Sequence, residues 1–241
     1  KANIRLQALD RQKTEFLSIA SHQLRTPLSI IKGFLELLGD GAYGRPTKKM
    51  IEIFGNMDES NERLVKLVDE FLNISRIEQG RTKFVFEAKD MNEIIDGVVK
   101  ELHSKADDKK LKFAWAPGSA ATVMMDADKV RHVIFNFVDN AIKYSDRGTV
   151  HVSVESRDEG MAVLVRDQGL GFDKIDQANF FQKFYRGKNV EGVSVNGTGL
   201  GIYVCRQFIE MHGGKVWAKS PGLGKGSEFG FWIPNKRPEA A

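Results

Sequence analysis

One histidine, His22, stands where a side chain could act as a nucleophile. Its surroundings read FLSIASHQLRTPL, and the apolar spacing from Phe16 to Leu38 predicts a helix that turns by about 100° per residue. His22 falls on the polar face of that helix, opposite the apolar stripe. A lone helical histidine is usually a surface or core residue, but a neutral imidazole is a good nucleophile near neutral pH. Pro27, further along the same helix, breaks the hydrogen-bond ladder and can kink or loosen it.

A second group of polar side chains lies on a helix predicted from about Asp128 to Tyr144. Asn136, Asn140 and Lys143 fall within about 60° of one another on it. Two amide oxygens on one face can hold Mg²⁺ alongside phosphate oxygens. A lysine one turn further on can neutralise phosphates, and the ring of Tyr144 could lie against a base. A solvated polar face would show the same pattern, so this helix alone does not establish a site.

Two glycine-rich segments are further candidates for a functional site. Asp167–Gly171 (DQGLG) follows a predicted strand, and Gly197–Gly201 (GTGLG) directly precedes a predicted helix. The carboxylate of Asp167 can accept the exocyclic amine of adenine, and the glycines after it would let the backbone approach the ring. Amides at the start of the later helix could bind phosphate. Either segment alone could be a plain turn. Together with the asparagine helix they indicate a nucleotide site, which makes His22 a candidate phosphoryl acceptor.

Composition narrows the class of protein. The 241 residues, of which 41% are hydrophobic, suffice for one large or two modest domains. The net charge of +4 is spread without a basic block, so no nucleic-acid partner is predicted. The single cysteine, Cys205, excludes an internal disulfide and fits a reducing compartment. No apolar run approaches the roughly 18 residues of a membrane span, and no signal peptide is visible. Because the chain lacks an initiator methionine and begins within a helical pattern, we expect a piece of a longer protein.

Two long amphipathic helices open the chain. Residues 1–14 predict a coiled-coil-like leading helix that continues into the His22 helix. The segment Gly39–Gly44 (GDGAYG) breaks it, and Pro46 suits the first turn of a second helix, predicted from Thr47 to about Gln79. The two helices predict an antiparallel hairpin over residues 15–80. Because one hairpin cannot cover both apolar stripes, we expect it to form a homodimeric four-helix bundle.

Mixed helix and strand signals fill residues 81–237 and predict an α/β sandwich, a mixed sheet with helices on one face. The strands are expected at 82–88, 111–115, 123–125, 150–156, 161–167, 216–220 and 227–233. The helices are expected at 90–105, where Asp90 and Glu93 form a capping box, at 128–144, and from Gly201 to His212. Residues 238–241 form a short tail.

Together these motifs resemble the catalytic core of a sensor histidine kinase of two-component signalling, and the resemblance covers nearly the whole chain. The matching segments are the phosphoacceptor box His22–Pro27 (HQLRTP), the N box Asn136–Tyr144 (NFVDNAIKY), the first glycine box Asp167–Gly171, the F box Phe180–Arg186 (FFQKFYR), the second glycine box Gly197–Gly201 and the terminal strand at Gly226–Phe229 (GSEF).

The resemblance implies a dimerisation and phosphoacceptor hairpin followed by a Bergerat-type ATP-binding domain that takes ATP or ADP with Mg²⁺. It implies that His22 is autophosphorylated and passes the phosphoryl group to an aspartate of a response regulator receiver domain. The implied nucleotide-binding residues are Asn136, Asn140, Lys143, Tyr144, Asp167, Gly169, Gly171, Lys183, Arg186, Gly197, Thr198, Gly199, Leu200, Gly201 and Ser227. Of these, Asn136 and Asn140 would also hold the metal, and the Ser227 hydroxyl would support Asp167. Residues 187–196 would form a mobile lid over ATP.

The resemblance also implies a cytoplasmic location, either as a soluble protein or as the cytoplasmic portion of a membrane-bound sensor. An upstream sensor domain would lie outside this chain. The implied catalytic group is His22, Gln23, Arg25 and Thr26. Thr26 matches the position that, in this family, positions water for dephosphorylating the partner.

Gln23 departs from the family pattern. The family usually has Glu or Asp directly after the histidine, where it acts as a general base or orients the imidazole, and an amide cannot accept the proton. Gln23 therefore favours an alternative, a nucleotide-binding signalling scaffold or a phosphatase-dominant module with weak autokinase activity. A gyrase-like ATP-hydrolysing machine is a third possibility, and the His22 hairpin argues against it.

Overall fold

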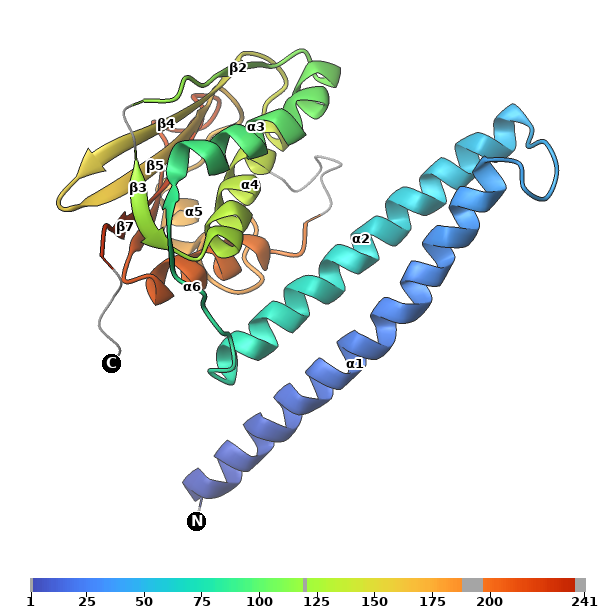
Figure 1. The fold of residues 1–241 in the computed structure, drawn as a ribbon, viewed down its shortest axis with the longest axis horizontal. Coiled ribbons are helices and arrows are strands. Elements are labelled where there is room, and N and C mark those ends of the chain that lie inside the picture. The colour runs from blue at the N-terminus through green and yellow to red at the C-terminus, as the bar shows by residue number, and fades with distance from the viewer. Residues whose placement is uncertain (1, 119–120, 188–196, 237–241) are drawn as a thin grey trace. The chain divides into compact units, whose positions relative to one another are not determined.

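The computed structural model describes residues 2–118, 121–187 and 197–236, and on the first helix it describes the side chains of Ile19, Ala20 and the residues from Gln23 onward. The side chain of His22, nearly all of the predicted lid and the predicted tail therefore lie outside the described residues. The chain divides into two units, Lys1–Lys83 and Phe84–Ala241, and each is described by itself (Figure 1).

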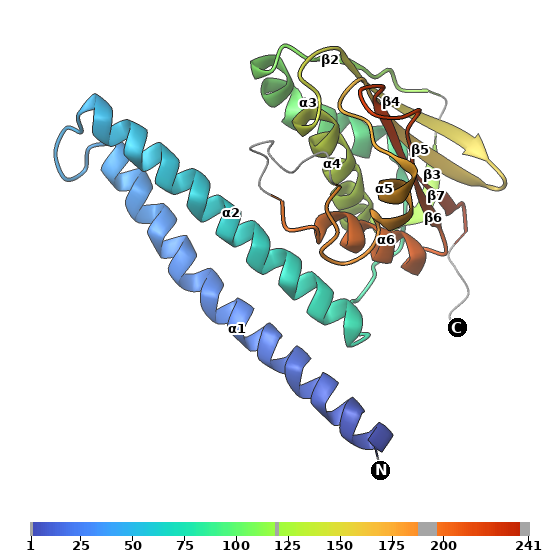
Figure 2. The same ribbon diagram turned by 180° about the vertical axis from the view of Figure 1, so that it is seen from behind.

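The first unit is a hairpin of two long helices, α1 (Ala2–Gly39) and α2 (Lys48–Glu78). Both views show them side by side (Figures 1 and 2). This confirms the predicted helices, and α1 continues without a break through Pro27. Pro46 lies before the second helix instead of in its first turn, because Thr47 is the N-cap and its hydroxyl accepts the N–H of Met50 at 3.3 Å. Among the described residues, no helix has the length and apolar content needed to cross a membrane.

A small apolar cluster joins the two helices of the hairpin. Leu28 of α1 packs with Val68, Leu72 and Val65 of α2. Beside it, the buried Asn61 donates its amide N–H to the carbonyl of Leu28 at 3.0 Å, which fixes the register of the helices. Many other large apolar side chains of the hairpin remain exposed: Ile19, Leu24, Ile30, Ile31, Phe34, Leu37, Met50, Ile51, Ile53, Met57 and Leu64.

The second unit contains a five-stranded sheet with the strand order β2-β4-β5-β7-β6. Its strands are β2 (Lys112–Ala114), β4 (Thr149–Arg157), β5 (Gly160–Asp167), β6 (Lys215–Lys219) and β7 (Ser227–Pro234). Strands β2 and β4 are parallel and the other pairs are antiparallel. Both views show α3 (Met91–Asp108), α4 (Ala127–Lys143) and α6 (Gly201–Met211) on one face (Figures 1 and 2). The predicted α/β sandwich is confirmed.

The core lies between this sheet and its helices. Phe137 of α4 packs against Phe229 and Phe231 of β7, with ring centroids 5.7 and 6.4 Å apart. Across the ladder, Val165 and Val163 of β5 face the same two phenylalanines and are buried. The packing fixes α4 on the sheet, and α4 carries the predicted asparagine face.

Two tryptophans cover the other face of the sheet. The alternation along β7 places Gly230 and Trp232 on the face opposite the phenylalanines. A Cβ atom at Gly230 would lie 2.5 Å from the indole of Trp217, and one at Gly160 would lie 2.5 Å from the indole of Trp232. The Trp217 indole also donates to Glu228 at 2.9 Å. Each indole is therefore held against a glycine of the neighbouring strand.

The predicted strand at 82–88 is wrong for most of its length. Only its end enters a ladder, as β1 (Glu87–Asp90), which pairs antiparallel with β3 (Thr122–Met125). Phe84 and Phe86 instead pack against the ring of His212, each at a centroid distance of 5.1 Å. The alternating apolar pattern is satisfied by packing on a helix end, not by strand pairing.

A short helix, α5 (Lys174–Asn179), lies in the segment for which the sequence predicted no regular structure. The carboxylate of Asp173 caps it by accepting the N–H of Asp176 at 2.8 Å. A helix of six residues is less than two turns long and shows no apolar period.

His212, predicted as a helix C-terminus, is the C-cap of α6 and is 1% exposed. Its Nδ1–H donates to the carbonyl of Phe208 at 2.6 Å, and its Nε2 accepts the N–H of Asp126 at 3.0 Å. The ring must be neutral to accept that bond. Burial lowers the pKa of His212 by more than Phe208 and Asp126 raise it.

We therefore expect the second unit to lose stability as the pH falls below about 6.5, the ordinary pKa of histidine. Below that pH the histidine binds a proton in the unfolded chain but stays neutral in the folded one. The free energy of unfolding therefore decreases as the pH decreases. Thermal unfolding of the wild type and of His212→Asn between about pH 5 and pH 8 measures this. The variant should show a flatter pH dependence, and His151→Gln, at an exposed position of β4, serves as the control. Equal slopes in wild type and His212→Asn would contradict the assignment.

Candidate functional site

The second half of α4 carries the predicted asparagine and lysine face. The carboxylate of Asp126 caps the helix by accepting the N–H of Lys129 at 3.1 Å. Asn136 is buried, whereas Asn140 and Lys143 are partly exposed. The helix thus holds these three side chains at the edge of the core, where a ligand could reach them.

The amide of Asn136 is oriented by the preceding turn. Its Nδ2 donates to Nε2 of His132 at 3.1 Å and to the His132 carbonyl at 3.2 Å. The nitrogen is therefore engaged, and the oxygen remains the available ligand. Among the described residues, no group of three or more His, Cys, Asp or Glu side chains could hold a metal ion. Two amide oxygens suit a hard cation that takes its remaining ligands from phosphates and water, so the donor set fits Mg²⁺ bound with a nucleotide.

Lys143 has a buried partner that sequence reasoning missed. Its Nζ lies 2.5 Å from Oδ2 of Asp139, and Lys105 of α3 forms a second ion pair with the same carboxylate. Burial raises the pKa of Asp139, but the two lysines outweigh burial, and the pKa is lowered. The spacing of Asp139 and Lys143, four residues apart on one helix, is a signal that could have revealed this pair.

The carboxylate of Asp167 lies where β5 ends. Ser227 of β7 stands opposite it in the ladder and donates its hydroxyl to the carboxylate, the contact that the family resemblance implied. The N–H of Gly169 donates to the other carboxylate oxygen at 2.8 Å. Burial raises the pKa of Asp167, against the lowering effect of these hydrogen bonds. A carboxylate has about four lone-pair positions, so Asp167 can still accept a further donor such as an amine.

Packing within the protein requires a glycine at position 169 of the first glycine box. A Cβ atom at Gly169 would lie 2.2 Å from the carbonyl oxygen of Tyr144, at the end of α4. That carbonyl accepts the N–H of Leu170 at 3.1 Å. Close approach of a nucleotide ring to Gly169 and Gly171 stays a prediction. The structure shows that the backbone of α4 already requires Gly169 and joins the first glycine box to the N box.

The F box is joined to the second glycine box. The N–H of Phe184 donates to the carbonyl of Gly199 at 3.1 Å. Gly199 has φ +72°, and a Cβ atom there would lie 2.7 Å from the carbonyl carbon of Phe184. Only glycine allows this approach without strain. Lys183 lies with its Nζ 5.1 Å from the ring centroid of Tyr203 on α6, which adds a second link.

The second glycine box is itself ordered by two contacts. Thr198 accepts the N–H of Leu200 on its hydroxyl at 3.1 Å. The side chain of Leu200 is buried, so it anchors the loop in the core instead of facing a ligand. Gly197 is exposed with open space around it, and α6 begins at Gly201. The helix N-terminus thus starts directly after a loop fixed at its centre.

Arg186 lies close to the N box. Burial raises the pKa of Tyr144, and the positive charges of Lys143 and Arg186 lower it, which places both cations near that phenol. The neighbouring Tyr185 donates its hydroxyl to Asp176 of α5 at 2.7 Å, a bond that raises the pKa of Tyr185 to about 12. The structure therefore brings the N box, both glycine boxes and the F box together around the end of α4.

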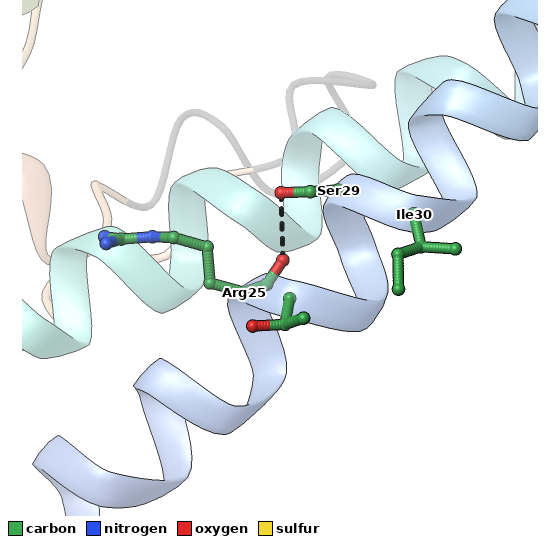
Figure 3. Close-up of a pocket in the computed structure, with 4 residues that line it drawn as sticks. Arg25, Ser29 and Ile30 are labelled. Atoms are coloured by element: carbon green, nitrogen blue, oxygen red, sulfur yellow. Dashed lines mark hydrogen bonds between the residues drawn. The ribbon is translucent and has the colours of Figure 1, made fainter.

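The phosphoacceptor box lies on α1 in the other unit. Arg25 pairs with Asp69 of α2, with Nε 3.1 Å from Oδ1, so it braces the hairpin. Arg25, Thr26, Ser29 and Ile30 line a surface hollow of about 390 Å³, and within it the Ser29 hydroxyl donates to the Arg25 carbonyl at 3.1 Å (Figure 3). Pro27 has no N–H to donate to the carbonyl of Gln23, so the regular hydrogen-bond ladder of α1 lacks one bond there.

Fold and site together define a class of proteins in which a helical hairpin precedes an α/β sandwich with a nucleotide-type site. Residues 12–80 match the family described as the His Kinase A (phospho-acceptor) domain. Residues 125–237 match the histidine kinase-, DNA gyrase B- and HSP90-like ATPases. The chain belongs to the histidine kinase family and forms the catalytic core of a sensor histidine kinase, as the resemblance of the sequence predicted.

Curated relatives and solved structures that are similar to this chain include sensor proteins and histidine kinases. Sensor histidine kinase WalK of Bacillus subtilis (strain 168) is 31% identical over 240 residues, covering 96% of this chain and 38% of the relative. Sensor protein SrrB of Staphylococcus aureus (strain N315) is 30% identical over 232 residues, covering 96% and 39%. The chain thus spans less than two fifths of the length of these relatives. The structure of full-length ShkA in complex with AMPPNP superposes with a TM-score of 0.77 at 26% identity, covering 94% of this chain and 47% of that chain. Histidine kinase AdeS of Acinetobacter baumannii gives 0.63 at 25% identity, covering 89% and 98%.

Proposed function

We propose that this chain is an ATP-dependent protein-histidine kinase that autophosphorylates His22 and passes the phosphoryl group to an aspartate of a response regulator. The observation that carries the proposal is the convergence of four nucleotide-type motifs around the end of α4, in a chain whose first helix bears HQLRTP. A ring nitrogen of His22 forms a bond to the γ-phosphorus while the bond to the β-phosphate oxygen breaks, ADP leaves and the ring N–H proton is released. The relative ShkA was solved with AMPPNP, which supports an ATP-type ligand.

In this proposal each motif has one task. Asp167, oriented by Ser227 and by the N–H of Gly169, accepts the adenine amine. Asn136 and Asn140 hold Mg²⁺, which when bound neutralises charge on the phosphate oxygens. The remaining charge faces Lys143, Lys183, Arg186 and the backbone amides at the start of α6.

Gln23 supports a second candidate, a nucleotide-binding scaffold or phosphatase-dominant module with weak autokinase activity. Its exposed amide can orient the neighbouring imidazole but cannot take its proton. Thr26 is exposed beside the hollow on α1, where its hydroxyl can position a water for attack on a phosphorylated partner. As a kinase, this chain would need another base, or solvent, to remove the proton from His22.

Incubation of the whole chain with Mg²⁺ and γ-labelled ATP separates the candidates. A kinase incorporates label that is acid-labile and base-stable, as expected for a phosphoramidate on histidine. A scaffold or phosphatase-dominant module binds nucleotide with little or no label on the protein, and an ATP-hydrolysing machine releases free phosphate. Absence of protein-bound label from a chain that binds ADP would overturn the kinase proposal in favour of the second candidate.

We further propose that residues 15–80 form a homodimeric four-helix bundle, preceded by the leading helix 1–14, and that residues 81–237 form the ATP-binding domain before the tail 238–241. Of the hairpin side chains that the structure describes, a few apolar ones are buried and an apolar series along both helices is exposed, which a second copy would cover. An ATP-dependent kinase needs the nucleotide pool of the cytoplasm, and an upstream sensor domain would supply the signal.

Phe34→Glu tests the dimer. Phe34 is 54% exposed, and a charge buried at a subunit interface costs several kcal/mol per ion. We expect the wild type to elute as a dimer and the variant as a monomer when light scattering measures the mass across a dilution series. Lys49→Glu places the same charge at an exposed polar position of α2 and should leave the dimer intact. If Phe34→Glu remains dimeric at the lowest concentration, the exposed series is not the dimer surface.

A further inference from the structure

Asp139 has one negative charge and two lysine partners. Its side chain is 4% exposed, and both Lys143 of the same helix and Lys105 of α3 form ion pairs with it. The three groups carry a net charge of +1, so one lysine alone would suffice to neutralise the carboxylate. The second lysine therefore needs an explanation.

An N–H of the Lys143 ammonium group that is donated to the Asp139 carboxylate cannot be donated to a phosphate as well. It lies on the face of α4 that carries Asn136 and Asn140, and its side chain is 26% exposed, so it can turn toward a ligand. If it left Asp139 without another lysine, a carboxylate would remain buried with its charge uncompensated, which is strongly unfavourable. That cost would be subtracted from the binding of any phosphate.

Lys105 is held where it can remain the ion-pair partner of Asp139 when Lys143 moves away. The next lysine one turn along, Lys109, donates to the carbonyls of Ile142 at 3.1 Å and Lys143 at 2.8 Å. These bonds attach the end of α3 to the end of α4. The backbone that carries Lys105 therefore stays beside Asp139 when Lys143 moves.

We propose that Lys105 is a positioning residue that keeps Asp139 neutralised, so that Lys143 is free to bind the phosphates of the nucleotide. The inference rests on the proposed nucleotide site and adds a residue from outside all of its motifs. Removing Lys105 takes away one of the two lysine ion pairs of Asp139, and each phosphate contact of Lys143 must then compete with the ion pair that is left.

The test compares nucleotide affinities of the full chain by isothermal titration calorimetry. Lys105→Met should weaken ADP and ATP about tenfold, which is about 1.4 kcal/mol, and leave adenosine, which has no phosphate, unchanged. Lys105→Arg keeps the charge and should bind ADP like the wild type, which keeps the test informative if the methionine variant folds poorly. Lys100→Met, on the same helix but paired at the surface with Asp96 at 2.7 Å, is the matched control.

A double-mutant cycle gives the deciding result. With Asp139→Asn the carboxylate is gone, so adding Lys105→Met should no longer weaken ADP binding. The proposal is overturned if Lys105→Met binds ADP as tightly as the wild type, if it weakens adenosine equally, or if its effect persists in the Asp139→Asn background. If the wild type itself binds no ADP, the proposed nucleotide function fails and this inference fails with it; wild-type binding with any of the other outcomes refutes this inference alone.

Discussion

Replacing His22 with alanine should abolish the acid-labile label that the chain acquires from γ-labelled ATP. The substitution removes the only nitrogen proposed to accept the phosphoryl group, so the expected loss is complete. Affinity for ADP should stay within about twofold of the wild type, a much smaller change than the tenfold that corresponds to about 1.4 kcal/mol. It should be retained because the proposed nucleotide residues all lie in the other unit of the chain.

His151→Ala is the matched control, because His151 is an exposed histidine on β4 with no proposed part in the chemistry. It should be labelled at the wild-type rate. Comparable labelling of His22→Ala would show that another side chain is the acceptor and would remove the role given to the HQLRTP box.

Asp167→Asn should weaken ATP and ADP alike, by about 10- to 150-fold. The range corresponds to the roughly 1.5–3 kcal/mol carried by a hydrogen bond to a charged group. Equal losses are expected because Asp167 is proposed to contact the base, which the two nucleotides share. The asparagine has nearly the same shape and can still accept a hydrogen bond from Ser227, so folding should be retained.

Calorimetric titration of both nucleotides measures the effect. Glu228→Gln changes the same charge one residue from Ser227, on the outer face of the sheet where Glu228 pairs with Arg166 at 2.7 Å, and should bind normally. Normal ADP binding by Asp167→Asn would mean that the adenine pocket lies elsewhere.

The long helices and the ladder strands could be read from the sequence because each keeps one apolar period over several turns or residues. The failures occurred where a pattern was short or satisfied in another way. Phe84 and Phe86 alternate like a strand, yet they pack on His212, a residue more than a hundred positions away. The six residues of α5 are too few to show a helical period.

The motifs of the candidate site were predictable because each is contiguous and its residue types suit one task. Their mutual supports were not, since they join distant parts of the chain. Lys105 and Asp139 are 34 residues apart, and Arg25 and Asp69 are 44 apart. No periodicity links such pairs; they follow from how α3 lies on α4 and how α1 lies on α2.

The indoles that lie against glycines on the outer face of the sheet have a practical consequence. The chain has three tryptophans, Trp115, Trp217 and Trp232, and all belong to the second unit. Their fluorescence therefore reports on the ATP-binding domain alone, whereas the far-ultraviolet circular dichroism contains a large contribution from α1 and α2. Recording both signals during one thermal scan would show whether the hairpin and the ATP-binding domain unfold together or in separate transitions, with neither a label nor a truncated chain.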